Sequence, residues 1–532
     1  SFKAKALTKL LMHTLQLADY IVFFIYFIAI SAYGYYIFHK KKSKTASSKD
    51  FFLAEGSLTW WAIGASLIAS NISAEHFIGM SGSGFALGLA ISTYEWMSAA
   101  TLIIVAVFII PLYLKNKIYT MPQFLQQRFD NRVRTTMALF WMAVYVFVNL
   151  TAVLWLGALA INTVTGVDMT TSMFILATLS VAYSLYGGLK AVAYTDIIQV
   201  VLLVGGGLFL SFMSLDMLGA GNGLWAGFDR LLTEVPDKFD MILTPDSPHY
   251  VSLPGLSVLL GGMWIMNLSY WGFNQYIIQR TLAAKDLAEA QKGIVFAAFL
   301  KVLMPVIVVL PGIAAVLLLP DLSKPDQAYP QLLSMMPSGI IGLIFAALVA
   351  AILSSLASMT NSVATIFTMD IYSQFKKDQS QQHYVKVGRI VSLVALVIAV
   401  FTAKPLLGEF DQAFQYIQEF TGFFTPGIVV LFLLGMFWAR TTATAALVAA
   451  ISSAVLSWIF KVALPEMPFM DRVGLVFLCC LALAVLVTLF QRQGKHPQAV
   501  ELRDISFETR PSFNLYAVLI SLIVAAFYIT WW

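Results

Sequence analysis

The sequence predicts an all-α integral membrane protein with about fourteen transmembrane helices, and three observations lead to this prediction. Of its 532 residues, 59% are hydrophobic and only 11% are charged, whereas about a quarter of the residues in a soluble domain are charged. Apolar segments of about 20 residues, the length that crosses a bilayer as a helix, recur along the chain. Two of these segments contain polar or glycine interruptions, which membrane helices keep where the backbone lines a cavity.

The first apolar segment covers residues 18–38 and is followed by Lys40, Lys41, Lys42 and Lys44. Its length and this basic flank favour a retained membrane anchor over a cleaved signal peptide. The other predicted spans are 59–84, 88–114, 133–161, 169–186, 195–219, 254–279, 293–320, 336–371, 387–404, 410–438, 441–464, 471–490 and 512–532.

The distribution of basic residues predicts how these spans are oriented. Positive charge gathers at 40–49, 115–134, 376–389 and 492–503, and these loops fall on one side of the membrane, which we expect to be the cytoplasm. The long loop 220–253 falls on the opposite side, and both termini are then extracytoplasmic. The net charge of +5 is spread over short loops rather than one face, so no nucleic-acid partner is expected.

Two spans carry similar interruptions. The span 59–86 is broken by polar residues at 70–73, and the span 254–279, about five spans later, contains Gly261-Gly262 and then the polar stretch 267–270. A block with an odd number of spans, repeated once, crosses the membrane in the opposite sense the second time. This arrangement is the inverted repeat of many secondary transporters, whose paired broken helices form a binding site at mid-membrane.

Ionisable residues inside apolar spans are candidate site residues because burying them in a membrane is costly. The deepest are Glu75, His76, Glu95, Lys301 and Glu419. Lys301 needs a partner from another helix, and Glu95 is the expected counter-charge. The alternative is a purely structural ion pair that holds two helices together.

Helical spacing groups further polar and aromatic residues. Ala69, Ile72, His76 and Met80 fall near one face of the first broken helix, and Asn267, Tyr270 and Trp271 near one face of the second. A mixture of hydrogen-bonding groups and flat aromatic walls suits a sugar. For the aromatic residues taken singly, ordinary packing is the alternative.

Small residues repeat with helical spacing on a later span, at Ala351, Ser354, Ser355 and Ser358. Such a stripe is typical of close helix packing in membranes. Together with carbonyl groups freed by the break near Ala69–Ile72, it also offers neutral oxygen ligands for sodium. Zinc would require His or Cys ligands instead.

Several stretches resemble signatures of the solute:sodium symporter family. They are 183–191 (YSLYGGLKA) with 195–199 (TDIIQ), then 70–79 (SNISAEHFIG), 274–280 (NQYIIQR) and 354–362 (SSLASMTNS). The resemblance extends from about residue 50 to residue 440. Within the family it is strongest to the bacterial galactose carriers, which are kin to the animal sodium/glucose cotransporters.

The resemblance implies a ten-helix, leucine-transporter-type inverted-repeat core of 5+5 helices. It implies an N-terminal extra helix and basic loop (1–50), repeats at 51–219 and 254–440 separated by an extracellular loop (220–253), and peripheral helices at 441–532. It also implies that sodium influx is coupled to hexose uptake by alternating access across a bacterial inner membrane.

The family's site residues map onto this chain position by position. The resemblance implies sodium ligands at Ala69, Ile72, Ala351, Ser354 and Ser355. It implies sugar contacts at His76, Glu95, Ser98, Asn267, Lys301 and Gln418, to which the helical spacing adds Trp271. Tyr270 resembles the inner gate with Asn71 beside it, and Met80, Tyr94 and Phe414 resemble the outer gate.

Two departures from the family pattern bear on substrate and stoichiometry. The bacterial galactose carriers have Gln at the position of His76, whereas the animal glucose carriers have His there, as this chain does. Galactose and glucose therefore both stay open as substrates. Ala357 replaces the hydroxyl residue of members thought to use a second sodium, which implies one sodium per sugar. The carboxylate matching Asp196 is linked in the family to sodium coupling or exit, and a helix cap formed by Thr195 and Asp196 is the alternative.

Other functions remain alternatives at this stage. Another polar solute, such as an inositol, sialic acid or an amino acid, could replace the hexose. The segment 79–82 (GMSG) resembles the nucleophile motif of intramembrane serine proteases, but His76 shares the helix of Ser81 and makes a poor base for it. A channel is the third alternative, and a homo-oligomer is left open.

Overall fold

The computed structural model describes residues 15–40, 58–118, 120–410 and 412–532, with side chains at 37–40 and 183–194 excepted. Its regular secondary structure in these ranges is helical, apart from one isolated bridge. Of the predicted basic clusters, 40–49 lies almost wholly outside the described residues, and so do the side chains of the signature 183–191. Leu58 forms an isolated parallel bridge with Ala284, which ties the start of the first broken helix to the end of the second.

The first predicted repeat begins with a broken helix. It contains α4 (Trp60–Asn71), α5 (Ser81–Leu87), α6 (Thr93–Ile104), α7 (Ile110–Lys115), α8 (Met121–Arg128), α9 (Asn131–Val144), α10 (Thr151–Thr165) and α11 (Met169–Leu218). Several of these helices are joined by π-helical turns, including Glu75–Met80 between α4 and α5. The backbone of α11 is helical over its whole length and includes both predicted spans 169–186 and 195–219.

The second predicted repeat has two interruptions in its first helix. It contains α13 (Leu256–Leu260), α14 (Gly262–Phe273), α15 (Gln275–Leu282), α16 (Leu287–Met304), α17 (Leu310–Leu318), α18 (Ala328–Leu333), α19 (Ile340–Thr365), α20 (Ser373–Phe375), α21 (Gln381–Leu407), α22 (Ala413–Thr421) and α23 (Thr425–Phe437). The breaks lie at Gly261 and at Asn274, whose backbone is extended. The polar stretch 267–270, expected to interrupt this helix, lies inside the continuous helix α14, because its side chains find partners across the bundle.

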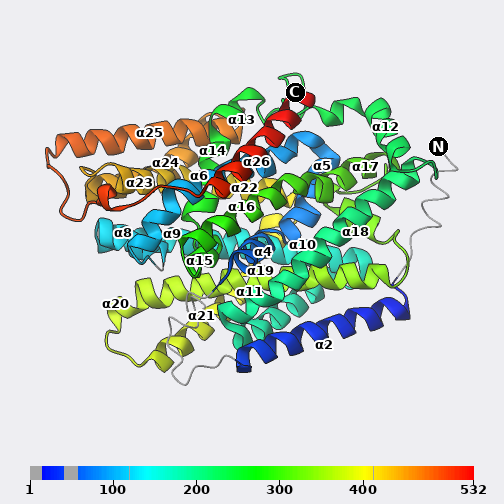
Figure 1. The fold of residues 1–532 in the computed structure, drawn as a ribbon, viewed down its shortest axis with the longest axis horizontal. Helices are drawn as coiled ribbons and strands as arrows, with labels where there is room; N and C mark the ends of the chain where they lie inside the picture. Colours follow the sequence, from blue (N-terminus) through cyan, green and yellow to red (C-terminus); the bar gives the residue numbers. More distant parts are fainter. Residues whose placement is uncertain (1–14, 41–57, 119, 411) are drawn as a thin grey trace.

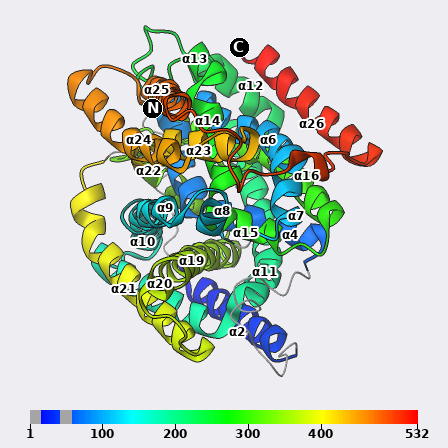
Figure 2. The same cartoon turned by 90° about the vertical axis from the view of Figure 1, so that its left-hand side faces the viewer.

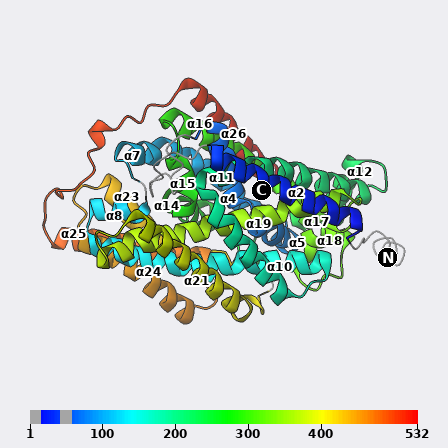
Figure 3. The same ribbon diagram turned by 90° about the horizontal axis from the view of Figure 1, so that it is seen from below.

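The remaining helices lie on the outside of the core. Figure 2 shows α2 (Leu17–Lys40), α24 (Ala443–Ala463), α25 (Phe469–Phe490) and α26 (Pro511–Thr530) at the periphery, and Figure 3 shows α2 beside α11 and α19. Asp19 fixes the start of α2, since its carboxylate accepts hydrogen bonds from the backbone N–H groups of Gly339 and Gly342 at the start of α19. The remaining helix, α12 (Leu224–Glu234), lies in the loop 220–253.

All fourteen predicted spans are helical over most of their described length. Ten described helices are long and apolar enough to cross a membrane without interruption, and the pair α22 and α23, bent by 46°, makes an eleventh. The other three predicted spans are the two broken helices and the short apolar stretch Met169–Ala182. A broken helix keeps neither the length nor the continuous hydrogen bonding of a simple span. The two broken helices are therefore the segments where a binding site is expected.

The described basic loops gather at one end of the molecule. Arg134 pairs with Asp370 at 2.8 Å, and Arg128 donates to the carbonyl of Gly435 at 2.7 Å. Figure 1 shows α8 and α20 at the left end and α12 at the right end, where α2 begins. The backbone of Met241, in the loop 220–253, bonds to that of Trp531, so the C-terminus lies near that loop. That the basic end faces the cytoplasm stays a prediction.

The bend between α22 and α23 is held by α24 and α25. The hydroxyl groups of Ser453 and Ser457 donate to the carbonyl of Phe423 in the bend, at 2.8 and 3.3 Å. At the end of α22, the Glu419 carboxylate pairs with Lys461 at 2.5 Å and with Arg472 at 3.1 Å. These contacts satisfy polar groups that a bent helix would otherwise expose to lipid.

We expect Glu419→Gln to lower thermal stability more than Glu234→Gln does. The first substitution leaves two partly buried cations without their shared carboxylate and should cost about 1–3 kcal/mol, whereas the second removes an exposed pair with Arg230 on α12 worth about 0.5 kcal/mol. Unfolding of the two purified variants in detergent, followed by tryptophan fluorescence, measures the difference. Equal losses would contradict the role given to Glu419.

Candidate functional site

The first broken helix releases the two backbone carbonyl groups that were predicted to bind sodium. α4 ends at Asn71, and Ile72 adopts an extended conformation with φ −79° and ψ 93°. The N–H of Ser73 donates to the carbonyl of Asn71 (3.1 Å), and the N–H of His76 donates to the carbonyl of Ser73 (3.1 Å). In a continuous helix those two N–H groups would bond to the carbonyls of Ala69 and Ile72.

The serine stripe of α19 lies directly against this break. Ser355 Oγ donates to the carbonyl of Ser70 at 3.5 Å, and Ser354 Oγ donates to Asp196 Oδ1 at 2.5 Å. Ala351 is fully buried on the same helix, one turn before Ser354 and Ser355. The structure therefore brings all five predicted sodium ligands onto two segments that face each other, and small side chains allow this approach.

Asp196 does not lie at a helix end. It is fully buried within α11, and its carboxylate accepts hydrogen bonds from Ser66 Oγ at 3.0 Å and from Ser354 on the opposite side. Arg280 Nη2 lies 3.7 Å from the same carboxylate and also donates to Ser358 Oγ. The helix-cap alternative for Asp196 is therefore wrong in this structure, because its partners are side chains of other helices rather than the N–H groups of a helix start.

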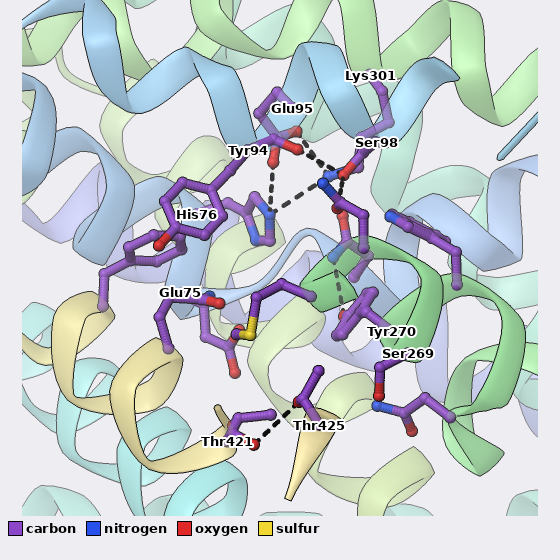
Figure 4. A pocket seen from close by; sticks show the side chains of 17 residues that line it. Glu75, His76, Tyr94, Glu95, Ser98, Ser269, Tyr270, Lys301, Thr421 and Thr425 are labelled. Atoms are coloured by element: carbon purple, nitrogen blue, oxygen red, sulfur yellow. Dashed lines mark hydrogen bonds and ion pairs between the residues drawn. The ribbon is translucent and has the colours of Figure 1, made fainter. Parts of the chain in front are cut away.

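A buried ion pair lies on the other side of the break. Lys301 Nζ donates to Glu95 Oε2 at 2.6 Å, His76 Nε2 lies 3.1 Å from Glu95 Oε1, and Lys301 Nζ lies 3.4 Å from His76 Nε2. Figure 4 shows the three side chains meeting at one end of a cavity. The pairing of Glu95 with Lys301 that the sequence predicted is thus present, and His76 joins it as a third member.

The other predicted sugar-contacting residues line the same cavity. Ser98 Oγ donates to Asn267 Oδ1 at 2.7 Å, and Lys301 Nζ lies 5.3 Å from the centre of a Trp271 ring. Including its open mouth, the cavity measures about 560 Å³, and its lining comprises Asn71, Glu75, His76, Tyr94, Glu95, Ser98, Met266, Asn267, Ser269, Tyr270, Trp271, Asn274, Lys301, Phe414, Gln418, Thr421 and Thr425.

Two groups of predicted gate residues form contacts at the cavity. Asn71 Nδ2 donates to the hydroxyl of Tyr270 at 2.9 Å. The rings of Tyr94 and Phe414 meet edge to face, with centroids 5.0 Å apart. Met80 is buried but is not among the residues that line the cavity.

Several buried polar atoms that line the cavity have no hydrogen-bond partner among the described residues. They include Asn71 Oδ1, Glu75 Oε1, Tyr94 OH, Asn267 Nδ2 and Trp271 Nε1. A buried polar group without a partner costs about 1–3 kcal/mol. Donors and acceptors left in this way around one cavity indicate a site for a small polar molecule.

Comparison with known proteins identifies the family. The family model described as the sodium:solute symporter family matches residues 51–452. The chain belongs to the sodium:solute symporter family. This symporter is 47% identical to the sodium/glucose cotransporter of Vibrio parahaemolyticus over 98% of its own chain and 99% of that protein. It is 35% identical to the human sodium/myo-inositol cotransporter 2 over 80% of its chain and 67% of that protein.

Solved structures confirm the type of fold. A Na⁺-coupled sialic acid symporter aligns over 91% of this symporter and 99% of its own chain, with a TM-score of 0.78 at 23% identity. Mhp1, a nucleobase-cation-symport-1 family transporter, aligns over 90% of the symporter and 99% of its own chain, with a TM-score of 0.54 at 13% identity. The leucine-transporter type of core is therefore confirmed, and the symporter co-transports sodium as its family does. The boundaries of the two repeats stay predictions.

The sequence did not single out every residue of the cavity. Met266, Ser269, Asn274, Thr421 and Thr425 line it and were not predicted, and Glu75 was noted only as a deep ionisable group. Glu75 and His76 begin a π-helical turn, a form that is rare in proteins and frequent at functional sites. Thr421 and Thr425 flank the bend between α22 and α23, and the sequence Gly422 to Pro426 was the available signal for that bend.

The Glu95–Lys301 pair allows a test that separates binding from structural support. Lys301→Met and Glu95→Gln should each lower stability by about 3–5 kcal/mol, because each leaves a buried charge without its partner. The double variant should recover most of this stability, since neither charge remains. Denaturation of the purified variants measures both effects.

Uptake assays on the same variants complete the test. If the pair binds the solute, the double variant stays inactive although it is stable. Recovery of both stability and uptake in the double variant would show that the pair only holds α6 and α16 together.

Proposed function

We propose that this symporter couples the inward movement of one sodium ion to the uptake of a hexose, galactose or glucose, by alternating access. The observation that carries the proposal is the cavity beside the first helix break, where polar atoms without partners among the described residues surround a space bounded by aromatic rings. The name of the Vibrio relative supports a sugar as the solute. In this reading the protein is a transporter and not an enzyme.

The cavity supplies the groups that recognise a sugar. Glu95 offers acceptors, Lys301 and the Asn267 amide Nδ2 offer donors, and His76 and Gln418 offer either according to orientation. Tyr270 and Trp271 present ring faces, which suit the apolar C–H face of a hexose. Each hydroxyl group of the sugar would replace a hydrogen bond to water with one to the protein, which is how a polar solute is bound without a large net loss.

Sodium would bind on the opposite side of the same break. We assign its ligands as the carbonyls of Ala69, Ile72 and Ala351 with the hydroxyls of Ser354 and Ser355, and we place Asp196 on its path of coupling or exit. The contact between Ser355 and the carbonyl of Ser70 supports this assignment. An ion bound between α4 and α19 would fix the position of the break and therefore of His76, only four residues beyond Ile72.

Alternating access follows from this shared segment. Sodium and the sugar both favour the conformation in which the break is ordered, and the gates then shift the population from an outward-open to an inward-open state. We assign Met80, Tyr94 and Phe414 to the outer gate and Tyr270 with Asn71 to the inner one. With a membrane potential of about 100 mV, one sodium ion contributes roughly 2.3 kcal/mol to accumulation.

A second candidate solute has an observation of its own. The 35% identity to a human sodium/myo-inositol cotransporter favours a cyclic polyol, which presents a similar ring of hydroxyl groups. A protease has less support, since His76 Nε2 is held by Glu95 and Lys301 and Ser81 lies on the same broken helix.

We further propose the cellular setting. A multi-pass protein with a bacterial relative of nearly equal length belongs in the bacterial inner membrane. The basic ends of the helices then face the cytoplasm, and both termini are extracytoplasmic. An assembly of several copies stays open.

Uptake by the purified protein in liposomes is the direct test. We expect labelled galactose or glucose to accumulate when a sodium gradient points inward and not when potassium replaces sodium, with charge and sugar moving in a ratio of one to one. Labelled myo-inositol tests the second candidate in the same vesicles. Two sodium ions per sugar would contradict the stoichiometry, and thousands of ions per sugar would indicate a channel.

Ser355→Ala should weaken sodium dependence more than sugar recognition. Losing one oxygen ligand of a cation should raise the sodium concentration for half-maximal uptake at least about tenfold, while sugar binding at saturating sodium changes less. Ser362→Ala is the matched control, because its hydroxyl donates to the carbonyl of Ser358 within the same helix. An unchanged sodium dependence in Ser355→Ala would overturn the assigned site.

A further inference from the structure

The cavity contains a second carboxylate, on Glu75, in addition to the paired carboxylate of Glu95. Glu75 is 4% exposed and lines the cavity directly. Figure 4 shows it between His76 and Thr421, on the side away from Glu95. It was not among the residues assigned to sodium or sugar above.

The surroundings of the two carboxylates differ. Glu95 has both oxygens occupied, one by Lys301 and one by His76. Glu75 Oε1 has no hydrogen-bond partner among the described residues, and no described cation forms an ion pair with this carboxylate. Its hydrogen-bonding neighbour is the uncharged side chain of Asn149.

The local backbone explains why two consecutive side chains reach one cavity. Glu75 and His76 open the π-helical turn Glu75–Met80 directly after the helix break. A π-helical turn is wider than an α-helical one, and here residues 75 and 76 both line the same space. His76 then meets Glu95, while Glu75 lies toward the bend that Thr421 and Thr425 flank.

Glu75 is the carboxyl group of the cavity lining that has no counter-charge at ion-pair distance among the described residues. Glu95 and Lys301 cancel each other at 2.6 Å, and an imidazole is ordinarily neutral at pH 7. Burial without a counter-charge disfavours the ionised form of the Glu75 carboxyl group, and a cationic group of a bound solute would favour it. An unpaired charge in a buried site is costly unless a ligand supplies its partner.

We propose that Glu75 contacts the transported solute directly and selects it by charge. Its free oxygen accepts a hydroxyl group of a neutral sugar, and accepts the ammonium group of an amino sugar more strongly. A sugar acid meets repulsion at the same place. The symporter therefore takes neutral and cationic hexose derivatives and rejects uronates. This inference rests on the proposed function and adds the charge class of its substrates.

The expected size of the selection follows from Coulomb attraction. Two unit charges about 5 Å apart, at an effective dielectric constant of about 20, interact strongly enough to change affinity by roughly tenfold or more. The pair of Glu95 and Lys301 lines the same cavity and is unchanged in Glu75→Gln, so a comparison of the two proteins removes its contribution to the preference.

The test uses hexose derivatives that differ in charge at one position. Inhibition of sodium-driven galactose uptake is measured for 6-amino-6-deoxygalactose, 6-deoxygalactose and galacturonate, and again for 2-amino-2-deoxygalactose against 2-deoxygalactose. The assays use proteoliposomes at a pH where the amine is protonated. In the unmodified protein at least one amine should inhibit about tenfold better than its neutral counterpart, and galacturonate should inhibit least.

Glu75→Gln should remove this preference. The advantage of the amine should fall about tenfold, galacturonate should inhibit better, and the neutral sugar should change less. Glu75→Asp keeps the charge and should keep the order of the three inhibitors. Glu234→Gln, a carboxylate on α12 outside the cavity, is the matched control and should behave as the unmodified protein.

The outcomes separate this inference from the function on which it rests. Absence of sodium-driven hexose uptake in the unmodified protein would contradict the proposed function. Normal hexose uptake with no preference among amine, neutral sugar and acid would overturn only the role of Glu75. If Glu75→Gln does not fold, as judged by thermal unfolding, the comparison among inhibitors in the unmodified protein and in Glu75→Asp still tests whether Glu75 selects solutes by charge.

Discussion

The structure depends on one constraint: a backbone carbonyl or N–H group inside a membrane must have a partner. The helix that begins at Trp60 is interrupted at Ile72, where the N–H groups of Ser73 and His76 turn to other carbonyls. The carbonyls of Ala69 and Ile72 are thereby released at mid-helix. Both residues are buried, and Ser355 on α19 donates to the neighbouring carbonyl of Ser70.

The side chains around the break support it from two directions. On one side, Arg280 donates to Ser70 Oγ at 2.9 Å and to Ser358 Oγ at 2.5 Å. The carboxylate of Asp196 balances the charge of Arg280. The same carboxylate accepts hydrogen bonds from Ser66 and Ser354. This network joins α4, α11, α15 and α19. On the other side, Glu95 and Lys301 join α6 to α16, beside the π-helical turn that carries His76. The broken helix thus connects a hydroxyl-rich region to a charged cavity within a few residues, which gives a physical route by which two ligands influence each other.

The peripheral helices also affect the cavity. α22 carries Phe414 and Gln418 into its lining, and the bend that follows is held by hydroxyl groups of α24 and by the cations around Glu419. The start of α22 is held as well, because the N–H of Ala413 donates to Asp326 Oδ2 at 2.9 Å. Helices outside the core therefore set the position of residues inside it.

The sequence by itself determined the membrane class, the fourteen apolar segments, the break near residue 72 and the pairing of Glu95 with Lys301. These follow from local properties, because a bilayer imposes length, apolarity and pairing of charges on each segment separately. The resemblance to a family then gave the type of core and the residues assigned to sodium and sugar.

Only the tertiary structure decided how these parts meet. It kept the predicted break at Gly261 and put the second break at Asn274 instead of at 267–270, because those polar residues find partners across the bundle and need no interruption. It replaced a helix cap at Asp196 with a contact between helices. It also placed Glu75 in the cavity wall, beside His76 but away from its partners. The reason is the same in each case: spacing along one helix tells which residues share a face, but which groups face them depends on the packing of helices far apart in the sequence.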